Sequence, residues 1–216
     1  MALPVTPQIS NIFCGMISVI EQVRNRIISL SPGACFTLKN FQDLQSETGV
    51  RTALTRLENE KLIRRLTQGV YEYPVRHKTL GIIPPDISRV AQAIADKNGN
   101  RIQPSGAHAA NLTGISDQVP GKIVFLTDGP AKTIKIANTE IIFKKATPKM
   151  MSAAGTKEGL VIQAIKFMKK ENINQAARGR IRKFLEGQST EDLSKNLRDA
   201  PAWIRNLVFE VMEEQK

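Results

Sequence analysis

Apolar residues in the first third of the chain recur first at helical spacing. Between Asn11 and Leu30 they fall three and four positions apart, which predicts an amphipathic helix. This helix is expected to end near Ser31-Pro32-Gly33, because proline lacks a backbone donor and glycine permits a left-handed turn. A brief extended element at 36–38 and a short helix that turns Phe41 and Leu44 inward are predicted next.

A second long helix is predicted from Glu47 to Lys61, with Ser46 as its N-cap. Its inward stripe consists of apolar residues: Val50, Ala53, Leu54 and Leu57. Its outward face consists of arginines and threonines: Arg51, Thr52, Thr55 and Arg56. A hairpin follows, with strands at 62–66 and 70–73 and its tip at Gln68-Gly69. This order of elements is that of a winged helix-turn-helix, which presents its second helix to the major groove of DNA.

The rest of the chain is predicted to form two further units. Residues 74–85, which include Gly81 and Pro84-Pro85, indicate a linker. Two short helices and three strands are predicted after it, at 87–94, 107–112, 122–127, 133–137 and 140–145. After Pro148 the pattern is helical, at 160–168, 173–185, 191–197 and 203–212. The expected fold class is α+β, with a winged helix-turn-helix domain at 11–78, a small mixed α/β domain at 79–148 and a helical C-terminal segment at 149–216.

The composition is that of a globular protein with a strongly cationic surface. Of the 216 residues, 41% are hydrophobic and 24% are charged, and the net charge is +11. Such a charge favours polyanionic partners, nucleic acid first. The excess is spread evenly: ten cationic against six anionic residues in 1–80, nine against five in 81–150, and twelve against nine in 151–216. No segment is therefore a polybasic arm.

Cysteine and histidine are too few to build a disulfide framework or a metal-ligand cluster. The chain has two cysteines, Cys14 and Cys35, and two histidines, His77 and His108. No apolar run is long enough to span a bilayer, and the run from Ile12 to Ile20 lacks the flanks of a signal peptide. We therefore expect a cytoplasmic protein without a membrane partner, a metal or another cofactor.

The sharpest candidates for function are basic and polar residues of the second helix and the hairpin. Arginines there can pair with guanine edges or phosphates, and threonines can reach a thymine methyl group or a phosphate. The expected DNA-contacting residues are Lys39, Arg51, Thr52, Thr55, Arg56, Arg64, Arg65, Thr67 and Gln68. A solvated helix face has a similar composition, so the basic hairpin behind the helix is what favours DNA binding.

A second basic cluster lies in the C-terminal segment. Its members are Arg178, Arg180, Arg182 and Lys183. They would serve as a second nucleic-acid contact or as a contact to an acidic protein, but a solvated helical face explains them at least as well.

No pattern in the chain indicates an enzyme. His108 has neither the cysteines of a metal site nor a serine–histidine–aspartate arrangement, although Asp117 and Asp128 follow it. The glycine-rich phosphate loops GxxxxGK[ST] and GxGxxG do not occur. The few aromatic residues do not alternate with basic ones, which argues against a stacking platform for single strands.

Two stretches of the chain resemble a known family. RTALTRLENEKLIRRLTQGVYEYP is similar to the N-terminal winged helix of the AbiEi-like antitoxins of bacterial type IV abortive-infection toxin–antitoxin systems. GAHAANLTGISDQVPGKIVFLTDG, continued by KTIKIANTEIIFKKA, is similar to the second half of that family. The resemblance covers about residues 15–150, with both halves in the family's order.

The resemblance implies an antitoxin that represses its own operon. Its winged helix would bind inverted repeats of double-stranded DNA in its own promoter, as a monomer or a dimer, and phage defence would be its setting. The rest would neutralise a cognate toxin, a nucleotidyltransferase-like protein, directly or functionally. The family's basic helix and wing map onto Arg51, Arg56, Arg64 and Arg65.

Two other functions compete with this one. The first is a stand-alone winged-helix transcriptional regulator whose α/β domain senses a ligand or mediates dimerisation. The second is an RNA-binding or RNA-processing protein that uses the basic C-terminal segment. A toxin gene next to this one would favour the antitoxin over the stand-alone regulator. RNA binding that survives removal of residues 36–73 would favour the RNA-binding or RNA-processing protein.

Overall fold

The computed structural model describes residues 18–44 and 46–214. Helix α1 (Val19–Ser29) begins at the N-cap Ser18, whose Oγ accepts from the backbone N–H of Glu21 at 3.4 Å. The part of the predicted first helix that precedes Ser18 lies outside the described residues, as do Cys14 and Gln45. The helix ends just before Ser31-Pro32-Gly33, as predicted.

The N-terminal elements follow the predicted order. After α1 come β1 (Cys35–Thr37), the 3₁₀ helix η1 (Leu38–Phe41), α2 (Glu47–Asn59), β2 (Arg64–Thr67) and β3 (Val70–Glu72). The three strands form an antiparallel sheet in the order β1-β3-β2. One apolar cluster joins the helices to this sheet: Val23, Ile27, Phe36, Phe41, Val50, Ala53, Leu54, Leu57 and Ile63. The predicted inward stripe of α2 is thus confirmed.

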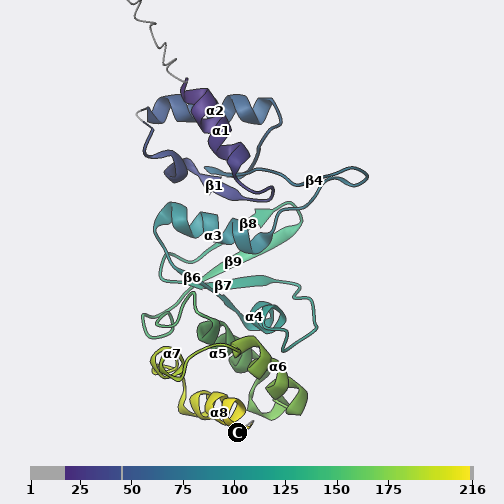
Figure 1. Ribbon diagram of the computed structural model, residues 1–216, viewed down its shortest axis with the longest axis vertical. Coiled ribbons are helices and arrows are strands. Elements are labelled where there is room, and N and C mark those ends of the chain that lie inside the picture. Colours follow the sequence, from purple (N-terminus) through teal and green to yellow (C-terminus); the bar gives the residue numbers. More distant parts are fainter. Residues whose placement is uncertain (1–17, 45, 215–216) are drawn as a thin grey trace, which may run out of the picture.

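The other face of this small sheet packs on α3 (Ile87–Asn98). Leu66 and Val70 from the β2–β3 hairpin, with Cys35 of β1, belong to the same cluster as Val90 and Ile94 of α3. Figure 1 shows α3 between the small sheet and a second sheet below it. The three-stranded sheet therefore contributes to two cores and is held on both faces. Burial raises the pKa of the Cys35 thiol to about 12, with Glu72 and Asp86 adding to the effect.

The second sheet contains four strands in the order β6-β7-β9-β8. Their bounds are β6 (Ile102–Ser105), β7 (Ile123–Thr127), β8 (Lys132–Ile136) and β9 (Thr139–Lys145). Strands β7 and β9 are parallel, and the other two pairs are antiparallel. The three predicted strands are confirmed, whereas β6 was not predicted. Its Pro104 argues against an inner strand, and β6 is indeed an edge strand, where proline is tolerated.

The prediction of a linker at 74–85 was wrong in part. Strands β4 (Arg76–His77) and β5 (Gly81–Ile82) pair within it as a short antiparallel hairpin. This hairpin projects from the side of the molecule (Figure 1). Its turn is held by Nδ1 of His77, which accepts from the backbone N–H groups of Thr79 and Leu80 at 3.2 and 3.3 Å.

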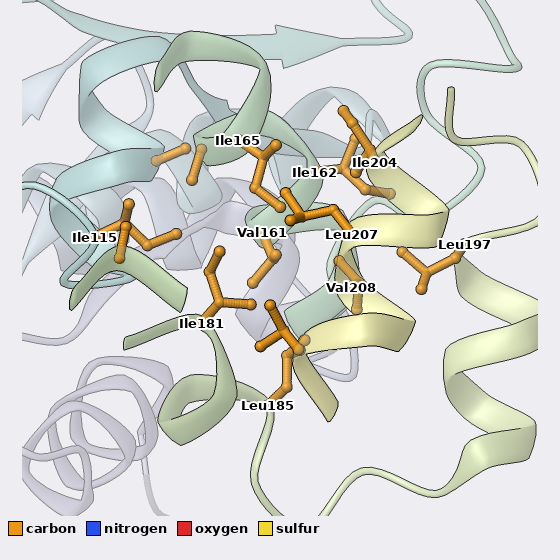
Figure 2. Packing of buried hydrophobic residues seen from close by; sticks show 14 of the residues in the cluster. Ile115, Val161, Ile162, Ile165, Ile181, Leu185, Leu197, Ile204, Leu207 and Val208 are labelled. Carbon is orange, nitrogen blue, oxygen red and sulfur yellow. The ribbon is translucent and has the colours of Figure 1, made fainter. Parts of the chain in front are cut away.

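The C-terminal helices are α5 (Lys157–Met168), α6 (Gln175–Leu185), α7 (Thr190–Asn196) and α8 (Ala202–Glu213). They close over α4 (Gly106–Leu112), whose Ala109 and Ala110 share their core. Figure 2 shows Ile165 and Val161 of α5 facing Ile181 of α6 and Val208 of α8. Helix α5 is buried on most sides, so this segment packs closely on the central unit. The predicted unit boundaries, after 78 and after 148, remain predictions.

The described chain is a mixed α/β protein, consistent with the expected α+β class. In the part that the structure describes, no helix is both long and apolar enough to cross a membrane.

Candidate nucleic-acid interface

A hollow of about 430 Å³ lies between α2 and the β2–β3 hairpin. We call it the basic groove; its lining residues are Thr37, Leu38, Lys39, Arg51, Thr55, Arg65, Gln68, Gly69, Tyr71 and Lys97. Four of them are cations that come from four elements: η1, α2, β2 and α3. None of these described lining residues is acidic. The groove is therefore a concentrated site of positive charge.

Helix α2 presents Arg51 and Thr55 to this groove because its opposite face is fixed in the core. Ser46 caps the helix, its Oγ accepting from the backbone N–H of Gly49 at 3.0 Å. One turn before Arg51, Glu47 accepts from its guanidinium at 2.6 Å. Both side chains of this pair are more than 60% exposed, 62% and 71%. Such a pair contributes about 0–1 kcal/mol, so the Arg51 guanidinium can exchange it for another anion at little cost.

Two lysines tie the floor of the groove to α3. Lys39 of η1 donates from Nζ to the backbone carbonyl of Asp96 at 2.9 Å. Lys97 donates in the other direction, from Nζ to the carbonyl of Gln68 at 2.7 Å. Gln68 and Gly69 form the predicted hairpin tip, and Gly69 has a φ of +70°. The hairpin tip is therefore held against the end of α3.

Sequence reasoning missed Lys97. It is the basic residue in the last turn of α3, a common position because the helix dipole favours cations there. Nothing in its local sequence indicates that it meets the hairpin, since that contact depends on how α3 packs under the small sheet. The contact links residues 29 positions apart.

The turn between η1 and α2 is tied to α1 by Arg26. Its guanidinium donates to both carboxylate oxygens of Asp43, at 2.5 and 2.6 Å, and to the carbonyl of Asn40 at 2.8 Å. Hydrogen bonding from Arg26 lowers the pKa of Asp43 to about 2. This clamp fixes the approach of the chain to α2, and with it the position of the groove wall.

The two arginines that open β2 have different surroundings. Arg64 donates to the carboxylate of Glu72 and, at 2.7 Å, to the carbonyl of Ile83. Glu72 is 1% exposed, so the guanidinium of Arg64 is the ion-pair partner of a buried carboxylate. Arg65 is exposed and lines the basic groove. Of the two predicted contacts, only Arg65 is therefore placed with the groove residues.

The remaining predicted contacts lie around the groove without lining it. Thr52 and Arg56 are exposed on α2, and Thr67 is half-buried at the end of β2. Arg56 donates to Glu60 at 3.1 Å. Hydrogen bonds from Arg24 first, and then from Arg56, lower the pKa of Glu60. The groove thus brings together five of the nine predicted DNA contacts: Lys39, Arg51, Thr55, Arg65 and Gln68.

The second basic cluster is largely engaged in contacts within the chain. Arg178 pairs with Glu214 at 2.6 Å, and Arg182 pairs with the same carboxylate at 2.9 Å. Arg180 pairs with Asp117 at 2.9 Å and donates to the carbonyl of Gly114. These arginines hold α6 against α8 and against the loop after α4. Lys183 of the cluster is exposed and has no role in that packing. The second nucleic-acid contact stays a prediction.

The acidic and histidine side chains considered for catalysis do not converge. His108 is buried, its Nε2 lies 3.5 Å from Oγ of Ser88, and burial lowers its pKa. Asp128 binds Arg101, whose hydrogen bond lowers the pKa of this carboxylate. Within 18–44 and 46–214, no three His, Cys, Asp or Glu side chains gather as metal ligands.

Residues 22–193 match the model of a protein family described as "Family of unknown function (DUF6088)". The match covers most of the chain, so the protein belongs to this family. No curated protein matches the chain. The matched region contains all four cations of the basic groove and ends within the C-terminal helices.

Proposed function

We propose that the protein binds double-stranded DNA through a winged helix-turn-helix and represses transcription. The observation that carries this proposal is the basic groove, where four cations surround an opening between an exposed helix and a hairpin. In this assignment α2 is the recognition helix and the β2–β3 hairpin is the wing. Helix α1 and η1 support α2 from behind, through the shared core and the Arg26 clamp.

The residue types of the groove match the two kinds of contact that DNA recognition requires. Lys39, Arg65 and Lys97 would contact phosphates, which supply affinity without reading sequence. Arg51 and Thr55 lie on the exposed face of α2, where an arginine can bind a guanine edge and a threonine a thymine methyl group. Phosphates would replace the neutral carbonyls that Lys39 and Lys97 now contact.

The biological role that we propose rests on the resemblance to AbiEi-like antitoxins. The protein would bind inverted repeats in its own promoter and counteract a co-encoded, nucleotidyltransferase-like toxin. Inverted repeats require two wings, from a dimer or from two monomers side by side. Co-expression with the toxin gene of the same operon tests this role: growth rescued by this protein supports it, and unchanged toxicity overturns it.

Arg51→Ala is expected to weaken binding to the promoter DNA and to reduce selectivity. If Arg51 pairs with a guanine edge, its loss costs about 1–3 kcal/mol on the cognate site and much less on unrelated DNA. A salt-titrated gel shift on the DNA upstream of the gene, with unrelated DNA as competitor, measures both effects. Arg198→Ala is the matched control, because Arg198 is an exposed arginine between α7 and α8 in the C-terminal helical region.

Two results would contradict this assignment. Equal losses by Arg51→Ala on cognate and unrelated DNA would mean that Arg51 contacts phosphate and that α2 does not read sequence. Wild-type binding that is equally weak on all DNA would overturn the proposed function itself.

A further inference from the structure

Lys132, in the four-stranded sheet, extends the positive charge of the basic groove beyond Lys97. Lys97 lies in the last turn of α3, and Lys132 begins β8, an edge strand of the four-stranded sheet. Side chains of Lys132, Ile134 and Ile136 share one face of β8, because alternate residues of a strand point the same way. Ile134 and Ile136 pack in the cluster beneath α3, so Lys132 lies on the side of the sheet that α3 covers.

Contacts within the chain fix the position of Lys132. Its ammonium lies 5.1 Å from the centre of the Phe143 ring, and its cross-strand partner on β9 is the same Phe143. The side chain therefore lies across an aromatic surface instead of extending freely into solvent. An anchored cation loses less conformational entropy on binding an anion than a freely rotating lysine does.

Lys132 lies on the face of the four-stranded sheet that α3, the helix of Lys97, covers. Partial burial first, and then the charge of Lys97, lower the pKa of Lys132. Lys97 itself donates to the carbonyl of Gln68, a neutral group, and the neighbouring Lys39 donates to another carbonyl. An anion bound between the ammonium groups of Lys97 and Lys132 would relieve the repulsion between these two charges, which favours the binding of a phosphate there.

We propose that Lys97 and Lys132 bind the phosphate backbone of DNA that flanks the segment read by α2. This inference rests on the proposed function and extends it. The nucleic-acid surface then continues from the wing across the end of α3 to the edge of the second sheet, and the central unit becomes part of the DNA-binding surface. Because Val90 and Ile94 of α3 pack against Val70 of the hairpin, the position of this site relative to α2 is fixed.

Lys132→Met tests the proposal with the full-length chain. Methionine keeps an unbranched apolar stem on Phe143 and removes the ammonium group. The magnitude of the salt slope of binding should fall by about 0.9, the value for one lost phosphate contact. The advantage of wild type over the variant should shrink about threefold between about 50 and about 200 mM salt. Lys195→Met removes an exposed lysine from α7 and should leave the slope unchanged.

Duplex length separates flanking contacts from contacts at the recognised segment. The measurement uses promoter duplexes shortened from either end in steps of about 5 bp, half a helical turn. The difference between wild type and Lys132→Met should disappear once one flank is removed, while the effect of Arg51→Ala persists. Thermal melting of each variant checks that the fold is intact.

The outcomes distinguish this inference from the proposed function. Selective wild-type binding with an unchanged salt slope in Lys132→Met overturns the inference and leaves the proposed function standing. A loss that persists on the shortest duplex that still binds overturns the flanking position. Unselective binding by wild type overturns the proposed function, and this inference with it.

Discussion

Arg64→Ala is expected to lower the free energy of unfolding by about 3 kcal/mol, the lower end of the cost of breaking a buried ion pair. The side chain of Glu72 is 2% exposed, and the variant would leave its carboxylate buried without the Arg64 guanidinium. The carbonyl of Ile83 would lose its partner as well. We use the lower end of the range because the Arg64 side chain is 28% exposed and water can enter part of its space.

Arg65→Ala is the matched control, one residue further along the same strand. Arg65 is exposed, so its removal should change the free energy of unfolding by less than about 0.5 kcal/mol. The two variants should then show opposite phenotypes: Arg64→Ala loses stability, and Arg65→Ala loses DNA affinity with normal stability. Urea unfolding and the salt-titrated gel shift measure the two effects on the same preparations.

Equal stability of the two variants would contradict the structural role of Arg64. Arg64→Lys refines the test, because a single ammonium lacks the planar fork with which arginine serves both Glu72 and the Ile83 carbonyl. The lysine variant should therefore lie between wild type and Arg64→Ala.

Two parts of the site could be predicted from local patterns in the sequence: the exposed face of α2 and the tip of the hairpin. The exposed face of α2 follows from the apolar stripe of Val50, Leu54 and Leu57, and the structure confirms that stripe. The hairpin tip follows from glycine at position 69, which adopts a positive φ. Both depend only on residues within one or two turns of each other.

Contacts between distant parts of the chain could not be predicted from local patterns in the sequence. The sequence predicts Arg64 and Arg65 together as wing residues, although strand alternation places adjacent side chains on opposite faces. Which of the two faces inward depends on Glu72 in the partner strand. Lys97 depends on the packing of α3 under the small sheet, and the pairing of the Arg178 cluster depends on the return of α8.

In the fold as well, elements with a strong local pattern were predicted, whereas elements that depend on pairing between distant residues were missed. Helices with a strong apolar stripe were placed to within a few residues, and so were the three strands bounded by turns. Strand β6 was missed because Pro104 breaks the pattern of an inner strand, and only its pairing with β7 reveals it. The β4–β5 hairpin was missed because two-residue strands carry too little pattern to be read.

Gly159→Ala is the second variant for which we expect a large effect, a loss of about 2–3 kcal/mol from overpacking. Gly159 lies in the first turn of α5, where the chain before the helix passes very close to it. A Cβ atom there would stand 1.9 Å from the carbonyl oxygen of Ala153 and 3.2 Å from Oε1 of Gln103. That glutamine accepts from the backbone N–H of Gly155 at 2.9 Å, so the turn has little room to move away.

Gly179→Ala separates this steric effect from helix propensity. Gly179 lies within α6 and is exposed, and an added Cβ would meet nothing within 4 Å. Alanine is favoured over glycine in a helix by about 0.8–1 kcal/mol, so this variant should gain stability. The same intrinsic preference for alanine acts at position 159, so the steric cost of the contact with Ala153 must exceed this gain for the variant to lose stability. Urea unfolding should therefore give opposite signs for the two substitutions, and a gain in both would show that α5 can move away from the preceding turn.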